Sequence, residues 1–248
     1  EGYTGQEKTY QRYFTRAMQP DGAGPGSWFI PFRMNSSGLV LTVRDIGNTF
    51  RIGVHEVLAT RVGEQSHADI PFNPAGYYDV GIGRRVDRLI IPVQTLGASV
   101  RLPADFRMTA EYARVRVNSA SEGLSRWGAY LAIDKHIGDW TPYLYYAKMR
   151  STGKALDLYR TIEATSRNPL LPGAIRNYQT FNADIVAAYD QWTVAIGTSY
   201  RLSPVSLLKA EYAHTSTGVV SSFVDAPTGS DSGKRRINVF SLSYNFTF

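Results

Sequence analysis

The sequence has no cysteine and no long apolar run. A helical membrane span needs roughly 20 consecutive apolar residues, whereas the longest candidate, Leu89-Ile90-Ile91-Pro92-Val93, ends after five. The sequence therefore predicts no helical membrane span. The lack of long apolar runs does not exclude a transmembrane β-sheet, because only every second residue of a strand has to face lipid. The lack of cysteine is typical of a chain that crosses an oxidising compartment.

Histidine and tryptophan are also scarce, with four residues each, while tyrosine is abundant with 16. Tyrosine suits a boundary between an apolar phase and water. The net charge is +6, but the basic residues are scattered singly, so nucleic-acid binding is not predicted. We expect one domain over residues 1–248. The chain begins with Glu1 and no charged-then-apolar leader follows, so we expect a processed or trimmed N-terminus.

The C-terminal segment alternates between apolar and polar residues. From Asn238 to Phe248 the even positions are mostly large and apolar, and the odd positions between them are mostly small and polar. Period-two alternation predicts a strand with one face in an apolar medium and the other in water. The pattern recurs along the chain and predicts nine strands, at 39–46, 49–59, 89–102, 105–117, 125–137, 141–151, 191–202, 205–217 and 236–248.

A hairpin sequence occurs twice. Residues 96–103 match residues 196–203 at an offset of one hundred, and the match continues without a gap through Ala110-Glu111-Tyr112-Ala113 and Ala210-Glu211-Tyr212-Ala213. Each copy consists of a strand, a tight turn with proline and a second strand. This repeat supports an architecture built from successive hairpins.

The connections between the predicted strands alternate in length. Tight turns at 46–49, 102–105, 137–140 and 202–205 alternate with long polar segments at 60–88, 152–186 and 218–234 and a shorter one at 118–124. Short turns at one rim and long loops at the other are typical of outer-membrane barrels. Residues 156–163 have helical character, and prolines at 169 and 172 interrupt it. We expect this segment to constrict a pore, to cover its mouth or to contact another subunit.

Two segments of the chain resemble those of a known family. The closing residues Ser241-Leu242-Ser243-Tyr244-Asn245-Phe246-Thr247-Phe248 resemble the C-terminal signature of Gram-negative outer-membrane proteins, and the hairpin from Thr193 to Thr215 resembles the C-terminal part of proteobacterial porins. The resemblance implies an all-β fold, a transmembrane antiparallel up-and-down β-barrel in the bacterial outer membrane. It also implies contact with outer-membrane lipid and lipopolysaccharide, recognition of Phe248 by the barrel-assembly machinery, and a homotrimer.

The first 38 residues match this pattern poorly. Nine strands with a descending last strand would place the start of the chain outside, which a closed barrel does not allow. Either residues near Thr9–Ala17 form a tenth, ascending strand, or the chain is the C-terminal part of a barrel of about 16 strands. Residues 1–38 otherwise remain an unassigned N-terminal segment or an external loop.

Strand parity predicts a charged face toward the lumen. The predicted pore-lining residues are Arg44, Arg51, Arg101, Arg107, Glu111, Asp134, Lys148, Arg150, Arg201, Lys209 and Glu211. Their basic excess predicts a passive diffusion channel for small hydrophilic solutes with a mild anion preference. The alternative is a hydrated wall whose charges are paired, Arg107 with Glu111 and Lys209 with Glu211. This hypothesis includes no catalytic residue, no cofactor and no metal.

The aromatic residues predict membrane-interface girdles on the lipid face. The predicted girdle residues are Tyr112, Trp127, Tyr143, Tyr145, Trp192, Tyr200, Tyr244, Phe246 and Phe248. The same parity places Tyr130 and Tyr146 on the lumen face. An alternative for these two tyrosines is a surface inside the pore on which sugar rings stack.

Three further alternatives remain. His214 and Ser216 share one face of a strand, so a base could reach a nucleophile, and the spacing is similar to the His-x-Ser element of outer-membrane phospholipase A. An orienting Asn or Asp has no clear match in the sequence. A structural barrel that contacts a partner is the second alternative. The third is a metal site in the loop region, made from His55, Glu56, Glu64, His67 and Asp69.

Overall fold

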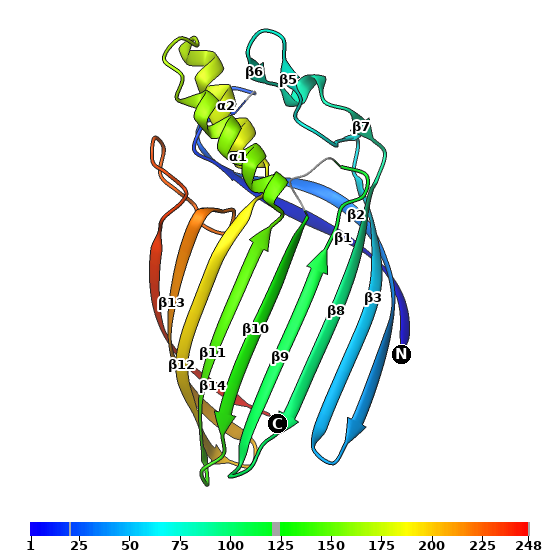
Figure 1. The fold of residues 1–248 in the computed structure, drawn as a ribbon, viewed down its shortest axis with the longest axis vertical. Coiled ribbons are helices and arrows are strands. Elements are labelled where there is room, and N and C mark those ends of the chain that lie inside the picture. Colours follow the sequence, from blue (N-terminus) through cyan, green and yellow to red (C-terminus); the bar gives the residue numbers. More distant parts are fainter. Residues whose placement is uncertain (20, 121–124, 248) are drawn as a thin grey trace.

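The computed structural model describes residues 1–19, 21–120 and 125–247. The fold is all-β and is built on one ten-stranded antiparallel sheet whose strand order follows the chain (Figure 1). The strands of this sheet are β1 (Gly2–Thr15), β2 (Gly26–Asp45), β3 (Asn48–Arg61), β8 (Leu89–Arg101), β9 (Phe106–Val115), β10 (Arg126–Lys135), β11 (Trp140–Ser151), β12 (Tyr189–Ser203), β13 (Ser206–Ser221) and β14 (Arg236–Phe246).

The N-terminal region adds a tenth strand to the nine that alternation predicts. β1 pairs with β2 along its whole length, from Gly2 opposite Leu39 to Thr15 opposite Gly26. The tenth-strand alternative therefore describes the structure, and the external-loop alternative for residues 1–38 is wrong. Alternation is weak in β1 because both of its faces are polar, with Glu7 on one face and Lys8 on the other.

The sheet curls but does not close. In Figure 1 the edge strands β1 and β14 curve round behind the central strands. Among the described residues, β1 and β14 form no backbone ladder with each other. At the long-loop end, side chains bridge the two edges instead. Arg12 of β1 forms an ion pair with Asp225, in the connection between β13 and β14.

The predicted asymmetry of the connections is confirmed (Figure 1). Four tight turns lie at one end, where Gly47 and Gly138 have positive φ, as do Ala104 and Asp105. At the other end, the connection between β3 and β8 holds four two-residue strands and a 3₁₀ turn. These are β4 (Ser66–His67), β5 (Phe72–Asn73), β6 (Tyr77–Tyr78), η1 (Val80–Ile82) and β7 (Arg85–Val86).

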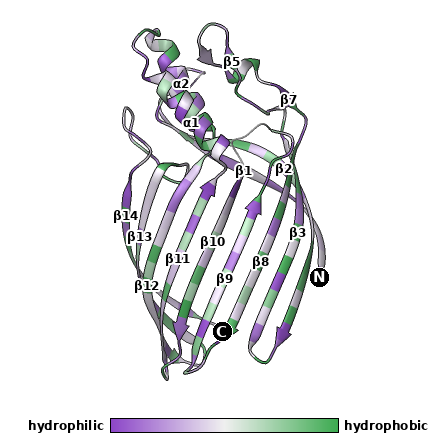
Figure 2. Cartoon of the chain, in the orientation of Figure 1, coloured by the Kyte–Doolittle hydropathy of each residue, from purple (hydrophilic) through white to green (hydrophobic). Residues whose placement is uncertain are grey.

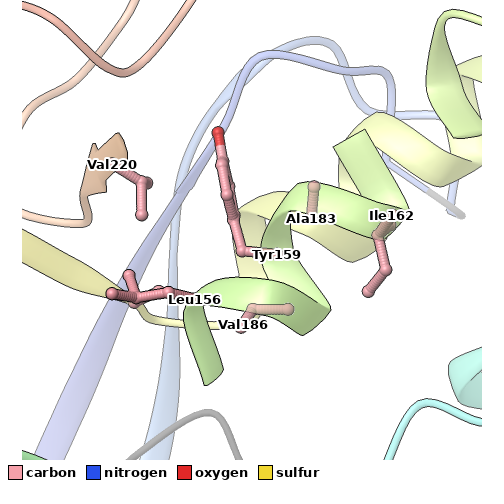
Figure 3. Close-up of a cluster of buried hydrophobic side chains, with 7 residues drawn as sticks. Leu156, Tyr159, Ile162, Ala183, Val186 and Val220 are labelled. Carbon is pink, nitrogen blue, oxygen red and sulfur yellow. The ribbon is translucent and has the colours of Figure 1, made fainter. Parts of the chain in front are cut away.

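The long connection between β11 and β12 folds into two helices, α1 (Gly153–Ser166) and α2 (Gly173–Ile185). The helical character predicted at 156–163 is confirmed in α1, and the prolines at 169 and 172 follow its end, whereas α2 was not predicted. Thr152 caps α1 by accepting a hydrogen bond from the Ala155 amide. The helices bury an apolar cluster against the end of β13 (Figure 3), formed by Leu156, Tyr159, Ile162, Ala183, Val186, Ala188 and Val220. Neither helix is long and apolar enough to span a membrane.

The two faces of the sheet differ in character. Figure 2 shows polar and apolar residues alternating along the strands. On the convex face, large apolar side chains such as Leu41, Ile196 and Leu242 are more than 60% exposed. The concave face is polar, less exposed and rich in glycine. Aromatic rings lie close against glycines on this face. The ring of Tyr143 is so near Gly197 that a Cβ at this position would collide with it. From β2 to β14 the convex face is thus mostly apolar and the concave face polar.

Candidate pore-lining face

One row of paired residues defines the concave face. Cross-strand pairing places Arg51 of β3 on the same side as Glu111 of β9 and Thr193 of β12, because directly opposite residues point to the same face. The full row is Arg51, Gly97, Glu111, Tyr130, Ala147 and Thr193. A cavity of about 600 Å³ runs along this row and touches residues from β3 to β12. The concave face therefore bounds a continuous space that can hold water.

Most of the predicted pore-lining residues lie on this face. Each of them lies an even number of residues along its strand from a member of the row that contains Arg51, or from a residue that pairs with a member. Their side chains therefore leave the sheet on the concave side. They are Arg44, Arg51, Arg101, Arg107, Glu111, Asp134, Arg201, Lys209 and Glu211.

Two predicted pore-lining residues lie on the opposite face. Lys148 pairs with Ala129 on one side and with Trp192 on the other, and Arg150 shares its parity. The prediction for Lys148 and Arg150 is therefore wrong. The physical reason is that the convex face loses its apolar character near the long loops, where Arg114 also lies. A charge at this end of a strand consequently does not indicate which face it occupies.

Three tyrosines also change faces relative to the prediction. Tyr143 and Tyr145 lie on the concave face, and Tyr146 lies on the convex face opposite Val194. The hydroxyl of Tyr143 donates to Glu211 Oε2 at 2.6 Å, and that of Tyr145 donates to Oε1 at 3.4 Å. Tyrosine carries both an apolar ring and a hydroxyl, so alternation in Tyr143-Leu144-Tyr145-Tyr146 does not distinguish the two faces.

The charges on the concave face are only partly paired. Lys209 Nζ lies 3.0 Å from Glu211 Oε2 and over the ring of Tyr143, so the alternative of a paired wall is correct for Lys209 and Glu211. The other pair of that alternative, Arg107 with Glu111, does not form. Within the described ranges Arg107 has no ion-pair partner, and its buried Nε has no hydrogen-bond partner. Among the residues that the structure describes, Arg107 therefore has no counterion.

A histidine network that alternation did not predict ties three strands together on the concave face. His55 Nδ1 lies 3.0 Å from the Tyr3 hydroxyl, and His55 Nε2 lies 3.2 Å from Thr95 Oγ1. These contacts connect β3 with β1 and β8. His67 lies instead in β4, in the loop region. No group of three potential ligands from His, Cys, Asp and Glu occurs among residues that the structure describes.

Aromatic pairs lie at two levels of the convex face. Toward the long loops, ring centroids lie 6.3 Å apart for Tyr112 and Trp127 and 6.4 Å apart for Tyr146 and Trp192. Toward the tight turns, the corresponding pairs are Trp140 with Tyr200 at 4.6 Å and Tyr244 with Phe246 at 6.3 Å. Phe248, the last predicted girdle residue, lies outside the described residues.

The convex face also holds the His214 and Ser216 pair. His214 Nδ1 lies 2.6 Å from Asn238 Oδ1 on the neighbouring strand β14. The sequence did not reveal this contact of Asn238, because its proximity to His214 depends on the register between β13 and β14. No hydrogen bond joins His214 to Ser216 in the part of the chain that the structure describes. The ring of Trp192 lies 5.5 Å from that of His214.

A buried ion cluster anchors the helices at the long-loop end. Arg16 lies just after β1 with its side chain 3% exposed, and its Nη2 lies 2.7 Å from Glu163 of α1 and 2.8 Å from Asp184 of α2. Its Nη1 also donates to the Ser230 carbonyl at 2.9 Å. Burial acts to lower the pKa of Arg16, but the two carboxylates outweigh this effect and raise it, so the guanidinium stays charged.

Comparison with known proteins gives no further assignment. No protein-family model, no characterised protein and no solved structure matches this chain. The functional argument therefore depends on the geometry of the two faces and of the loop end.

Proposed function

We propose that the chain forms the wall of a passive diffusion channel for small hydrophilic solutes in a bacterial outer membrane. The observation that carries this proposal is the separation of an apolar convex face from a charged concave face. Trp192 and Tyr200 mark the two aromatic levels and lie eight residues apart on β12, about 26 Å along a strand. With the usual tilt this corresponds to roughly 20 Å across the membrane, close to the apolar band of such barrels.

A bilayer requires that both sheet edges be paired. Lipid provides no partner for backbone N–H and C=O groups, so the free edges of β1 and β14 need a ladder partner in the membrane. We infer that these edges pair when the protein inserts, which closes the curled sheet around the 600 Å³ cavity. Three basic residues of the convex face lie next to the aromatic level that is nearer the long loops, namely Arg114, Lys148 and Arg150. They are suited to contact phosphate groups of lipopolysaccharide.

The concave charges favour anions. With Lys148 and Arg150 removed from the wall, basic residues still outnumber acidic ones among the predicted lining residues, and Arg51, Arg107 and Arg201 have no ion-pair partner within the described ranges. Unpaired cations in an aqueous passage raise the local anion concentration. Salt screens this potential over about 10 Å at 0.1 M, so the preference is mild and weakens at high salt.

Planar-bilayer recording tests the channel and its selectivity. We expect conductance, and an anion-directed reversal potential in a KCl gradient that Arg107→Gln combined with Arg201→Gln reduces. Lys148→Gln is the matched control, because it removes the same charge from the convex face. An unchanged reversal potential in the double variant, or an equal effect of Lys148→Gln, would contradict this assignment of charges. Absence of conductance would end the channel proposal.

A lipid-ester hydrolase is the second candidate, favoured by the contact between His214 and Asn238. Asn238 Oδ1 would hold the proton on Nδ1, which leaves Nε2 as the base for the Ser216 hydroxyl. Ser216 Oγ would attack the ester carbonyl, and His214 would pass the proton to the leaving alcohol. Water, deprotonated by His214 in turn, would then attack the acyl-Ser216 ester and release the carboxylic acid and the free serine hydroxyl. The test is hydrolysis of phospholipid in mixed micelles, lost in Ser216→Ala and retained in Ser241→Ala on the concave face. If conductance and hydrolysis are both absent, a structural barrel that contacts a partner becomes the best account.

A further inference from the structure

A second cavity lies at the long-loop end, away from the row of concave charges. Its volume is about 440 Å³, within the range of small-molecule sites. Residues from β1 and β2, from the connection between β3 and β8 and from both helices contribute to its lining. The cavity therefore lies where α1 and α2 meet the concave side of the sheet.

A stack of four aromatic rings forms one wall of this cavity. The centroids of Tyr13 and Trp28, which are cross-strand partners, lie 5.3 Å apart with an interplanar angle of 20°. Trp28 stacks on Phe181 of α2 at 5.6 Å and 21°, and Phe181 on Tyr178 at 6.3 Å and 10°. All four residues line the cavity. The stack presents a long, flat surface suited to a planar ring.

The other walls combine aliphatic side chains with a few polar and charged ones. Ile70, Val80 and Leu89 contribute apolar side chains. The charged lining residues are already paired, because Arg61 lies 3.2 Å from Glu64, and Asp69 accepts from the Arg84 amide at 2.6 Å. A charged ligand would thus meet no free counterion in this lining.

Two polar side chains of the lining have atoms without partners. Ser66 is 5% exposed, and its Oγ and the buried Nδ1 of His67 have no hydrogen-bond partner among the described residues. Burial, together with the charges of Arg85 and Arg61, lowers the pKa of His67, so the imidazole is neutral. Neutral polar groups beside an apolar cavity fix the orientation of a ligand that carries one hydrogen-bonding group.

We propose that this cavity binds a small, uncharged aromatic molecule that carries a hydroxyl group. The aromatic stack selects a planar ring over an aliphatic one, the paired charges disfavour an ionised ligand, and Ser66 and His67 form the polar end of the site. This proposal does not depend on the channel, because binding is measured without a membrane potential or a conducting pore.

Three probes of similar size separate these requirements. The full chain, held in an amphipathic polymer, is titrated calorimetrically with biphenyl-4-ol, with 4-cyclohexylcyclohexanol and with biphenyl-4-carboxylate. We expect saturable binding of one biphenyl-4-ol per chain, and at least tenfold weaker binding of the other two. Equal binding of the aliphatic alcohol would overturn the proposal and indicate a site for lipid or detergent tails. Binding that does not saturate would overturn it as partition into the polymer.

Matched variants locate the site. Trp28→Leu is expected to weaken biphenyl-4-ol binding at least tenfold, and Trp127→Leu on the convex face is expected to leave it unchanged. His67→Ala, which preserves the aromatic wall, is expected to weaken binding, while His214→Ala is not. If Trp28→Leu fails to fold, the two histidine variants decide the question. Unchanged affinity in both cavity variants would refute this location.

Discussion

Replacing Arg16 with alanine is predicted to release the helices from the mouth of the sheet. Arg16 joins four segments of the chain, because it follows β1 and contacts α1, α2 and the connection between β13 and β14. The substitution would leave Asp184 nearly buried and without its counterion, close to Glu163, which would keep only its ion pair with Arg167. Burial already raises the pKa of Asp184, and Arg16 opposes that rise.

The expected magnitude follows from this burial. Breaking a buried ion pair by removing one partner costs about 3–5 kcal/mol. The exposed pair between Arg160 and Asp157 on α1, with side chains 53% and 70% exposed, contributes only about 0.2–1 kcal/mol. Arg160→Ala is therefore the matched control. It removes an arginine that pairs with a residue of α1, as Arg16 does, but leaves no buried charge.

Hydrogen exchange of the full chain in detergent measures the effect. We expect Arg16→Ala to accelerate amide exchange throughout α1 and α2, with little change in the central strands, and Arg160→Ala to resemble the wild type. Combining Arg16→Met with Glu163→Gln and Asp184→Asn removes the uncompensated charges and should restore much of the protection. Equal exchange in Arg16→Ala and Arg160→Ala would refute the argument that this cluster holds the helices.

Two further predictions concern the helices and the concave face. Burial and the charge of Glu163 raise the pKa of Tyr159 to about 12. Its stabilising contribution, at most about 3 kcal/mol, is therefore complete below pH 10 or so and is lost as the pH rises through about 12. Circular dichroism should show this alkaline loss of helix reduced in Tyr159→Phe. Gly197→Val should lower the melting temperature by forcing Tyr143 off the sheet, at a cost of about 1–3 kcal/mol. Ser199→Val on the same face of β12 should have a smaller effect, and equal effects would contradict the close-packing argument.

The sequence predicted the fold best where one strand face is strongly apolar. The alternation from residue 236 onward, the tight turns and the break between the two helices each depend on local chemistry, and the structure confirms them. β1 lacks the period-two signal because both its faces are polar. A tenth strand was therefore predicted only as one alternative, from the direction of the other strands, and its extent, Gly2–Thr15, follows from its pairing with β2.

The site was harder to predict because its contacts depend on register. Asn238 lies beside His214 only through the pairing of β13 with β14, and Arg16 meets Glu163 across 147 residues of sequence. No local pattern encodes either contact. Lys148 was placed on the wrong face because a basic residue beyond the apolar band is as compatible with headgroups as with a lumen.

Reactivity of single introduced cysteines along β9 tests the central claim most directly, since the natural chain has none. The variants are Met108→Cys, Thr109→Cys, Ala110→Cys and Glu111→Cys, each reconstituted in planar bilayers and exposed to a charged, membrane-impermeant thiol reagent. Successive residues of a strand face opposite sides. The proposed channel therefore predicts that the thiols at 109 and 111 react and reduce the conductance, while those at 108 and 110 do not. The reverse pattern, or equal reaction at all four positions, would contradict an aqueous concave face.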